Sequence, residues 1–143
     1  MNPQAMPHLL MKGRLAWALK SPAPNDVDVV QDATVVLGAR SFFDADILVF
    51  RANRSQRYVL PQDVLLAVEV ADTSHARDLR TKAPRYGTAG VPELWVVELN
   101  ERQTYVFRGP GTPAWDAPAW IGFDAPLSPL FLTDAQIRLS ELV

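Results

Sequence analysis

Two carboxylates interrupt apolar runs of this sequence, and they are its first indication of chemistry. Glu69 lies near the end of VLLAVEV at 64–70, and Asp46 opens DILVF at 46–50. Burying an unpaired carboxylate is costly, so such residues are normally paired, hydrogen-bonded or bound to a metal. If the two runs form neighbouring strands, both carboxylates could converge on one site. Each acid taken alone also fits a solvated strand end.

A third charged residue, Lys82, belongs to a run in which Asp78, Lys82 and Tyr86 are spaced by four. Residues four apart share one stripe of a helix, so one interpretation is a surface salt bridge. The other interpretation puts Lys82 over Asp46 and Glu69. Asp, Glu and Lys together suit metal-assisted phosphodiester hydrolysis, in which carboxylates hold Mg²⁺ or Mn²⁺ together with water and substrate phosphate. The metal lowers the pKa of bound water, and a lysine orients the water or stabilises developing charge.

The periodicity of the chain predicts the elements that must position these residues. Spacings of three and four predict helices over 7–20 and 75–88, the second capped by Thr73-Ser74 and containing Pro84. Apolar and β-branched runs predict strands at 27–30, 34–37, 46–50, 64–70, 93–99, 103–108, 119–123 and 136–139. The first two strands are expected to pair through a tight turn at 31–33. The helix between 64–70 and 93–99 predicts a crossover, with those strands parallel or near each other, in an α/β or α+β sandwich.

Length and composition set the class of protein. The chain has 143 residues, 48% of them hydrophobic, and no cysteine. We expect a single domain over 1–143, whose last part, 109–143, is rich in Pro and Trp. Disulfides and thiolate zinc sites are excluded. No apolar run reaches the roughly 20 residues that span a bilayer, and no signal peptide is apparent, so we expect no membrane association and a cytoplasmic location.

The net charge of −2 excludes a globally basic nucleic-acid binder, yet it leaves room for a local basic surface. Two basic clusters lie on the predicted loop at 51–57 and on the second helix: Arg51, Arg54, Arg57, Arg77, Arg80, Lys82 and Arg85. Each cluster is compatible with an ordinary solvated face. Beside an acidic site, both would contact phosphates. Trp115 and Trp120 could stack on bases, or cover the edge of the core or a dimer interface.

Two segments carry a resemblance to a known family. VEVADTS at 68–74, the stripe Asp78, Lys82 and Tyr86, and GVPELWVVEL at 90–99 closely resemble a large bacterial family of putative restriction endonucleases in the PD-(D/E)XK nuclease superfamily. The resemblance runs from His8 to about Arg108 and is dense over 64–99. It implies an αβββαβ core, with a mixed central sheet flanked by helices.

The resemblance also implies roles for individual residues. Asp46 matches the motif aspartate, Glu69 the second metal ligand and Lys82 the catalytic lysine. The backbone carbonyl of Val70 would complete the metal ligands, and Asp78 and Tyr86 would support Lys82. His8 matches a histidine that the family often has in its first helix.

Three departures from the family pattern matter. Ala45 replaces the usual proline before the motif aspartate, and Ala71 replaces the superfamily's strand lysine, whose charge Lys82 would supply from the helix. Family members usually carry a further N-terminal segment with an acidic residue, whereas this chain starts almost at His8.

From the resemblance we expect a Mg²⁺- or Mn²⁺-dependent endonuclease acting on DNA as a homodimer. The alternative is a catalytically inactive copy of the fold that serves as a binding or scaffolding module.

Overall fold

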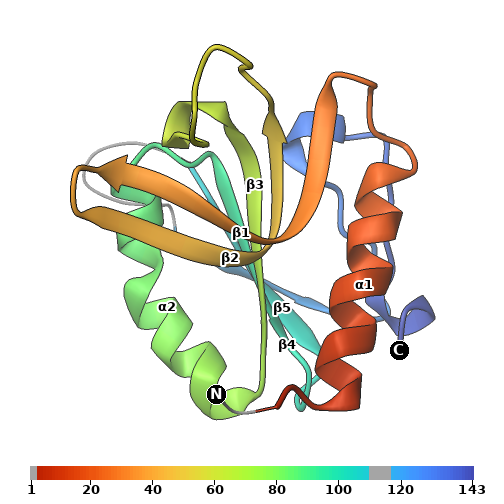
Figure 1. The fold of residues 1–143 in the computed structure, drawn as a ribbon. Helices are drawn as coiled ribbons and strands as arrows, with labels where there is room; N and C mark the ends of the chain where they lie inside the picture. Colours follow the sequence, from red (N-terminus) through yellow and green to blue (C-terminus); the bar gives the residue numbers. More distant parts are fainter. Residues whose placement is uncertain (1–2, 110–116) are drawn as a thin grey trace.

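The computed structural model describes residues 3–109 and 117–143 (Figure 1). The described chain contains two α-helices and six strands, in the order α1 (Met6–Lys20), β1 (Val27–Gly38), β2 (Ser41–Arg51), β3 (Val64–Ala71), α2 (Thr73–Thr88), β4 (Glu93–Glu98), β5 (Gln103–Arg108) and β6 (Ala119–Gly122). Three short 3₁₀ helices lie at Pro61–Asp63, Leu130–Leu132 and Leu139–Glu141. The mixed sheet flanked by helices confirms the predicted α+β class.

The strands of the described chain form one sheet in the order β1-β2-β3-β4-β5-β6. Every neighbouring pair is antiparallel except β3 and β4, which are parallel. Parallel neighbours need a long crossover connection, and α2 supplies it. The predicted relation between the runs at 64–70 and 93–99 is therefore confirmed. β3 is buried along nearly its whole length, as its almost continuous apolar sequence predicts.

The two helices cover opposite faces of the sheet (Figure 1). Met11, Leu15 and Leu19 of α1 pack on one face, together with apolar residues of the C-terminal segment after β6. Ala76, Leu79, Ala83 and Tyr86 of α2 pack on the other. Alternate residues of each central strand therefore contact different helices. Val68 and Val70 face the α1 side, and Ala67 and Ala71 face the α2 side.

The expected hairpin at 27–37 is wrong, because β1 is one strand of 12 residues. The ladder to β2 continues on both sides of the expected turn, with Gln31 opposite Ile47 and Ala33 opposite Ala45. Asp32 adopts a left-handed φ of 55° between them, so the local distortion is absorbed without reversing the chain. The reversal comes after Gly38, before β2 begins. The order α1-β1-β2-β3-α2-β4 is the αβββαβ core that the resemblance implies.

Helix α2 starts earlier than expected, and its cap is Asp72 rather than Thr73 or Ser74. The Asp72 carboxylate accepts a hydrogen bond of 2.9 Å from the backbone N–H of His75. Thr73 uses its hydroxyl elsewhere, since it donates to Glu98 Oε1 at 3.1 Å. Pro84 lies inside the helix, as the sequence predicts, and has no N–H to donate to the preceding turn.

The C-terminal segment contains one of its two expected strands. The expectation for 119–123 is confirmed by β6, but no strand forms at 136–139 within the described residues. Ile137 makes only an isolated bridge with Leu127, and the 3₁₀ helix at Leu139–Glu141 follows. Both residues are buried on the α1 side of the sheet, so this segment contributes to the core without extending the ladder. Trp115 lies outside the described residues.

Neither described helix is long and apolar enough to span a bilayer.

Candidate active site

Asp46 and Glu69 come together where the pairing of β2 with β3 ends. The last paired residues are Ile47 and Val68. One step further, Asp46 Oδ2 accepts a hydrogen bond of 2.8 Å from the backbone N–H of Val70, so a side chain replaces the missing backbone partner. Glu69 precedes Val70 and is only 6% exposed. The convergence of the two carboxylates therefore follows from the strand register.

The environment of Glu69 disfavours its negative charge. Burial raises the pKa of Glu69 well above its usual range, and the negative charge of Asp46 raises it further. The hydroxyl of Tyr86 donates to Glu69 Oε1 at 3.0 Å, which lowers the pKa and offsets part of the rise. Burial and the charge of Glu69 also raise the pKa of Tyr86, so its phenol stays protonated and remains a donor. Tyr86 was expected to support Lys82; it lines the same cavity as Lys82, and its hydroxyl donates to Glu69.

His8 approaches the same point from α1, on the opposite side of the sheet from α2. Its Nε2 lies 2.7 Å from the carbonyl oxygen of Val70 and 3.6 Å from Asp46 Oδ2. Its Nδ1 lies 3.2 Å from Gln4 Oε1, which also accepts a hydrogen bond from Lys12. His8 therefore contacts both the backbone and the side chain of the candidate metal ligands.

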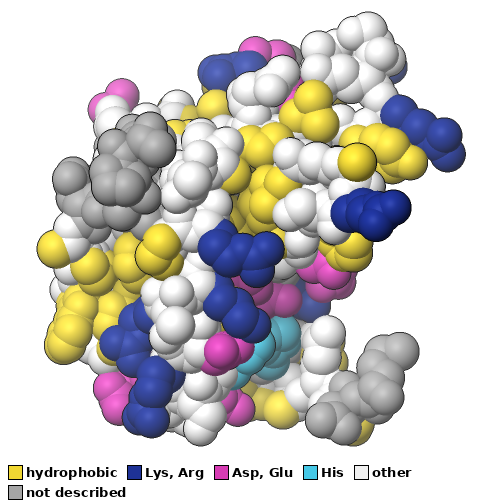
Figure 2. Space-filling view, turned by 90° about the vertical axis from the view of Figure 1, so that its left-hand side faces the viewer, with side chains coloured by type: hydrophobic (Ala, Val, Ile, Leu, Met, Phe, Trp, Pro, Cys, Tyr) yellow, Lys and Arg dark blue, Asp and Glu magenta, His cyan; other side chains and the backbone are white. Residues whose placement is uncertain are grey.

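Lys82 lies on the α2 side of this carboxylate pair. Its Nζ is 3.0 Å from Asp78 Oδ2, in an ion pair whose two side chains are about half exposed. Lys82 and Glu69 line one cavity of about 260 Å³ between α2 and the β1–β2 hairpin, with the buried carboxylate reached from the cavity and the lysine at its border. In Figure 2, acidic and histidine side chains gather in a hollow bordered by lysine and arginine.

The predicted arginines lie in four different surroundings. Arg85 lines the cavity that contains Glu69 and Lys82. Arg80 turns the other way, with its guanidinium 4.2 Å from the ring centroid of Tyr105, and its Nε is buried without a hydrogen-bond partner among the described residues. Arg77 is exposed on α2. The loop arginines line a separate hollow of about 230 Å³, where Arg51 pairs with Asp26 at 3.3 Å: Arg51, Arg54 and Arg57.

Comparison with known proteins gives this arrangement a family. The sequence matches the Uma2 family, described as putative restriction endonuclease, over residues 1–140. The chain belongs to this family. It also resembles a crystal structure of a putative nuclease belonging to DUF820 from Anabaena variabilis, with a TM-score of 0.78 and 14% sequence identity over 99% of this chain and 82% of the other. That likeness shows a shared fold. Among curated proteins, no sequence matches.

The cavity of this Uma2-family chain is also lined by residues that the sequence did not single out. Phe43, Asp44 and His75 accompany Glu69 and Lys82 there. His75 precedes Asp78 by three residues, so it lies on the same helical stripe and could have been found by spacing. Asp44 lies two residues before Asp46 on β2, and its carboxylate accepts a hydrogen bond from the Thr34 hydroxyl on β1.

The donor set of the Uma2-family chain fits a hard divalent cation. Within the described residues, no group of three or more His, Asp or Glu side chains surrounds a common point. Mg²⁺ does not need one, because it keeps several waters and binds through one or two carboxylates plus substrate phosphate. Asp46 and Glu69 supply two carboxylates, and the rise that the charge of Asp46 imposes on the pKa of Glu69 is what a cation between them would relieve. The carbonyl of Val70 has a second lone pair beside the one that faces His8.

Proposed function

We propose that this chain is a divalent-metal-dependent endonuclease that hydrolyses phosphodiester bonds of DNA. The observation that supports it best is the pair Asp46 and Glu69, held together beside a cavity that Lys82 also lines, in a fold of the restriction endonuclease family. Carboxylate oxygens that can bind a metal ion, next to a positively charged lysine, are a combination that suits phosphodiester hydrolysis.

Asp46, Glu69 and the Val70 carbonyl would hold Mg²⁺ or Mn²⁺. When bound, the cation supplies a water of lowered pKa and neutralises charge on the reacting phosphate. The chain itself keeps these ligands in position. The Val70 N–H fixes Asp46, the Tyr86 hydroxyl fixes Glu69, and His8 fixes the Val70 carbonyl.

Lys82 acts from the cavity side. The Lys82 side chain is long and about half exposed, so its ammonium group can contact a phosphate oxygen that enters the cavity or orient the attacking water. The ion pair with Asp78 holds the Lys82 side chain against its own helix until a phosphate enters the cavity. Phosphate contacts further along the nucleic acid are proposed for five of the predicted arginines, since the guanidinium of Arg80 lies over the ring of Tyr105: Arg51, Arg54, Arg57, Arg77 and Arg85.

Two observations favour a second candidate, a non-catalytic module that binds without cleaving. Lys82 pairs with Asp78 rather than with Glu69, and Ala71 leaves β3 without the lysine of the superfamily signature. A chain with this function would bind nucleic acid or a partner and leave the phosphodiester bonds intact.

Plasmid nicking separates the two candidates. We expect the wild-type protein to nick supercoiled plasmid in Mg²⁺ or Mn²⁺ and to stop in EDTA. Lys82→Ala should reduce the rate by about 10²-fold, the usual scale for losing one group that stabilises transition-state charge. Arg138→Ala removes an exposed cation from the C-terminal segment and should retain the wild-type rate. Equal nicking by wild type and Lys82→Ala would point to a contaminant and contradict the enzyme.

We further propose that the protein acts in the cytoplasm. We also propose that it acts as a homodimer, because two-fold assembly offers one site to each strand of a duplex. Sedimentation velocity at concentrations that support nicking should then give twice the monomer mass of 15.9 kDa. A species of monomer mass that nicks plasmid at full rate would contradict the dimer and leave the proposed chemistry standing.

A further inference from the structure

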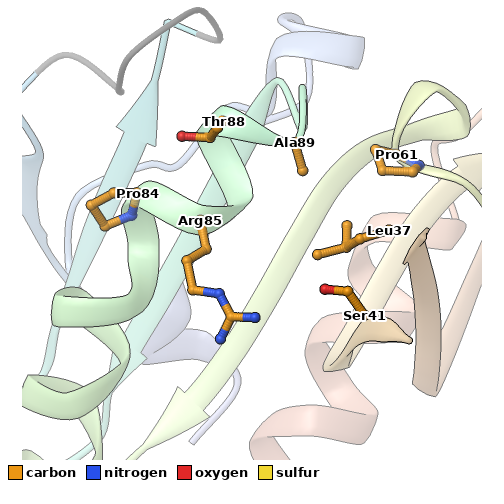
Figure 3. Close-up of a pocket in the computed structure, with 7 residues that line it drawn as sticks. All are labelled: Leu37, Ser41, Pro61, Pro84, Arg85, Thr88 and Ala89. Carbon is orange, nitrogen blue, oxygen red and sulfur yellow. The ribbon is translucent and has the colours of Figure 1, made fainter. Parts of the chain in front are cut away.

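A second cavity adjoins the candidate active site. It is an open hollow of about 420 Å³ between the C-terminal half of α2 and the β1–β2 hairpin, and Figure 3 shows Arg85 reaching between the two walls. Arg85 lines both cavities. The two hollows therefore follow one another along α2, with Lys82 at the first and Arg85 at the boundary.

The lining of the second cavity differs from that of the first. Apolar side chains dominate it, and the Ser41 hydroxyl points toward the helix (Figure 3); the lining residues are Leu37, Ser41, Pro61, Pro84, Arg85, Thr88 and Ala89. A site for phosphate alone would present cations and N–H groups. Apolar walls with one guanidinium and the Ser41 hydroxyl suit a nucleobase, which stacks on arginine and apolar side chains and hydrogen-bonds at its edges. The volume lies within the range of small-molecule sites.

The position of the cavity relates it to the reacting phosphate. Residues three apart on a helix are neighbours, about 5–6 Å apart at their Cβ atoms. A phosphate held by Lys82 therefore leaves the adjoining nucleotide beside Arg85. In a stacked duplex the base of that nucleotide faces the helix interior, and it can reach a protein cavity only after it turns out of the stack.

We propose that this second cavity, which we call the base subsite, receives the base of the nucleotide next to the scissile phosphate. The inference rests on the proposed nuclease function and names its substrate class: nucleic acid with an unpaired nucleotide at the point of cleavage. Turning a base out of a duplex costs a few kcal/mol, and the cost is least for a mismatched or single-stranded base. Substrates that already carry an unpaired nucleotide are preferred.

Cleavage of matched oligonucleotides tests the preference. One substrate is fully paired, and the other has the same cleaved strand with a single mismatch. The wild-type protein should cleave the mismatched substrate at least about tenfold faster, since the base-turning cost is largely removed. Ala89→Trp fills the base subsite and should bring the two rates within about twofold, because neither base is then accommodated. Thr81→Trp adds the same bulk to an exposed position of α2 that lines neither cavity, and should keep the preference.

A binding measurement in EDTA keeps the inference independent of cleavage. Fluorescence anisotropy should show tighter binding of the mismatched duplex by wild type and Thr81→Trp, and equal binding of both duplexes by Ala89→Trp. Discrimination in binding with no cleavage in any metal would overturn the nuclease and retain the base subsite. If the wild-type protein cleaves and binds the paired and mismatched duplexes equally, or if Ala89→Trp still prefers the mismatched duplex, the base subsite is overturned and the nuclease is retained. If the wild-type protein neither cleaves DNA nor discriminates between the two duplexes in binding, both the nuclease and the base subsite are overturned.

Discussion

Glu69→Gln should lower metal-dependent cleavage by about 10³-fold, on the scale of several kcal/mol of lost transition-state stabilisation, and should make the folded protein more stable. The two effects have one cause. Glu69 is buried beside Asp46, so its negative charge is costly in the absence of a cation, and the proposed metal would need that charge as a ligand. Glutamine keeps the shape and an oxygen that accepts from Tyr86, and removes the charge.

The sign of the pH dependence follows from the raised pKa of Glu69. A carboxyl group whose pKa is higher in the folded state binds its proton more tightly there, so folding is favoured while the group is protonated. This contribution is complete below the ordinary value of 4.5 and is lost as pH rises through the raised pKa. In EDTA, the free energy of unfolding of wild type should therefore fall over that range relative to Glu69→Gln. Urea titrations at a series of pH values measure the difference.

A control variant and a measurement of metal binding test the prediction for Glu69. Glu101→Gln removes an exposed carboxylate from the β4–β5 turn and should change neither cleavage nor the pH profile. Calorimetric titration should detect Mn²⁺ binding to wild type and to Glu101→Gln, and weaker or no binding to Glu69→Gln. Full cleavage by Glu69→Gln would show that this carboxylate has no role in holding a metal, and a stability curve in EDTA parallel to that of wild type would contradict the raised pKa of Glu69.

Arg108→Met should destabilise the fold by about 3 kcal/mol, near the lower end of the cost of breaking a buried ion pair from one side. Its partner Glu93 is 0% exposed, and the two side chains meet at 2.7 Å from Arg108 Nε to Glu93 Oε2. Glu93 also accepts from the Trp95 indole at 2.9 Å and from the backbone N–H of Leu130 at 2.9 Å. Removing Arg108 leaves a buried carboxylate with only neutral donors. The cost stays at the lower end because Arg108 is 40% exposed.

A double-mutant cycle distinguishes this loss from a general effect of substitution. The free energy of unfolding can be followed through Trp95, whose indole contacts the pair. Glu93→Gln combined with Arg108→Met should recover part of the loss, because no unpaired charge then remains buried. Arg138→Met, at an exposed position, should cost less than about 0.5 kcal/mol. An Arg108→Met variant no less stable than Arg138→Met would contradict the role assigned to the pair.

The sequence alone predicts those elements whose signals are local and strong. VLLAVEV and ELWVVEL became β3 and β4, because a continuous apolar run can be satisfied only by burial on both faces. The single β1 was missed, because Gln31-Asp32-Ala33 looks polar enough for a turn. Its continuation depends on β2, whose Ile47 and Ala45 pair on either side of Asp32. Long-range pairing of this kind leaves no mark on the local sequence.

The candidate site divides in the same way. Asp46 and Glu69 could be paired in advance, because acids in apolar strands need a reason to be there. The contact between Tyr86 and Glu69 could not, since it depends on how α2 packs across the sheet. Arg80 and Arg85 are both arginines of α2, yet one stacks on Tyr105 and the other borders the cavity. Helical spacing separates their faces, but only the neighbouring strands decide which face has a function.

The hydrogen bond from Val70 to Asp46 has a consequence for hydrogen exchange. Most amide protons of a central strand are protected by the backbone of a neighbouring strand, and they exchange when a whole unit of structure opens. The amide proton of Val70 is held instead by a carboxylate oxygen that is also a candidate metal ligand. Its exchange rate therefore follows the charge and position of one side chain. Among the amides of β3, that of Val70 should therefore respond to binding of the proposed cation, while its neighbours report the opening of the fold.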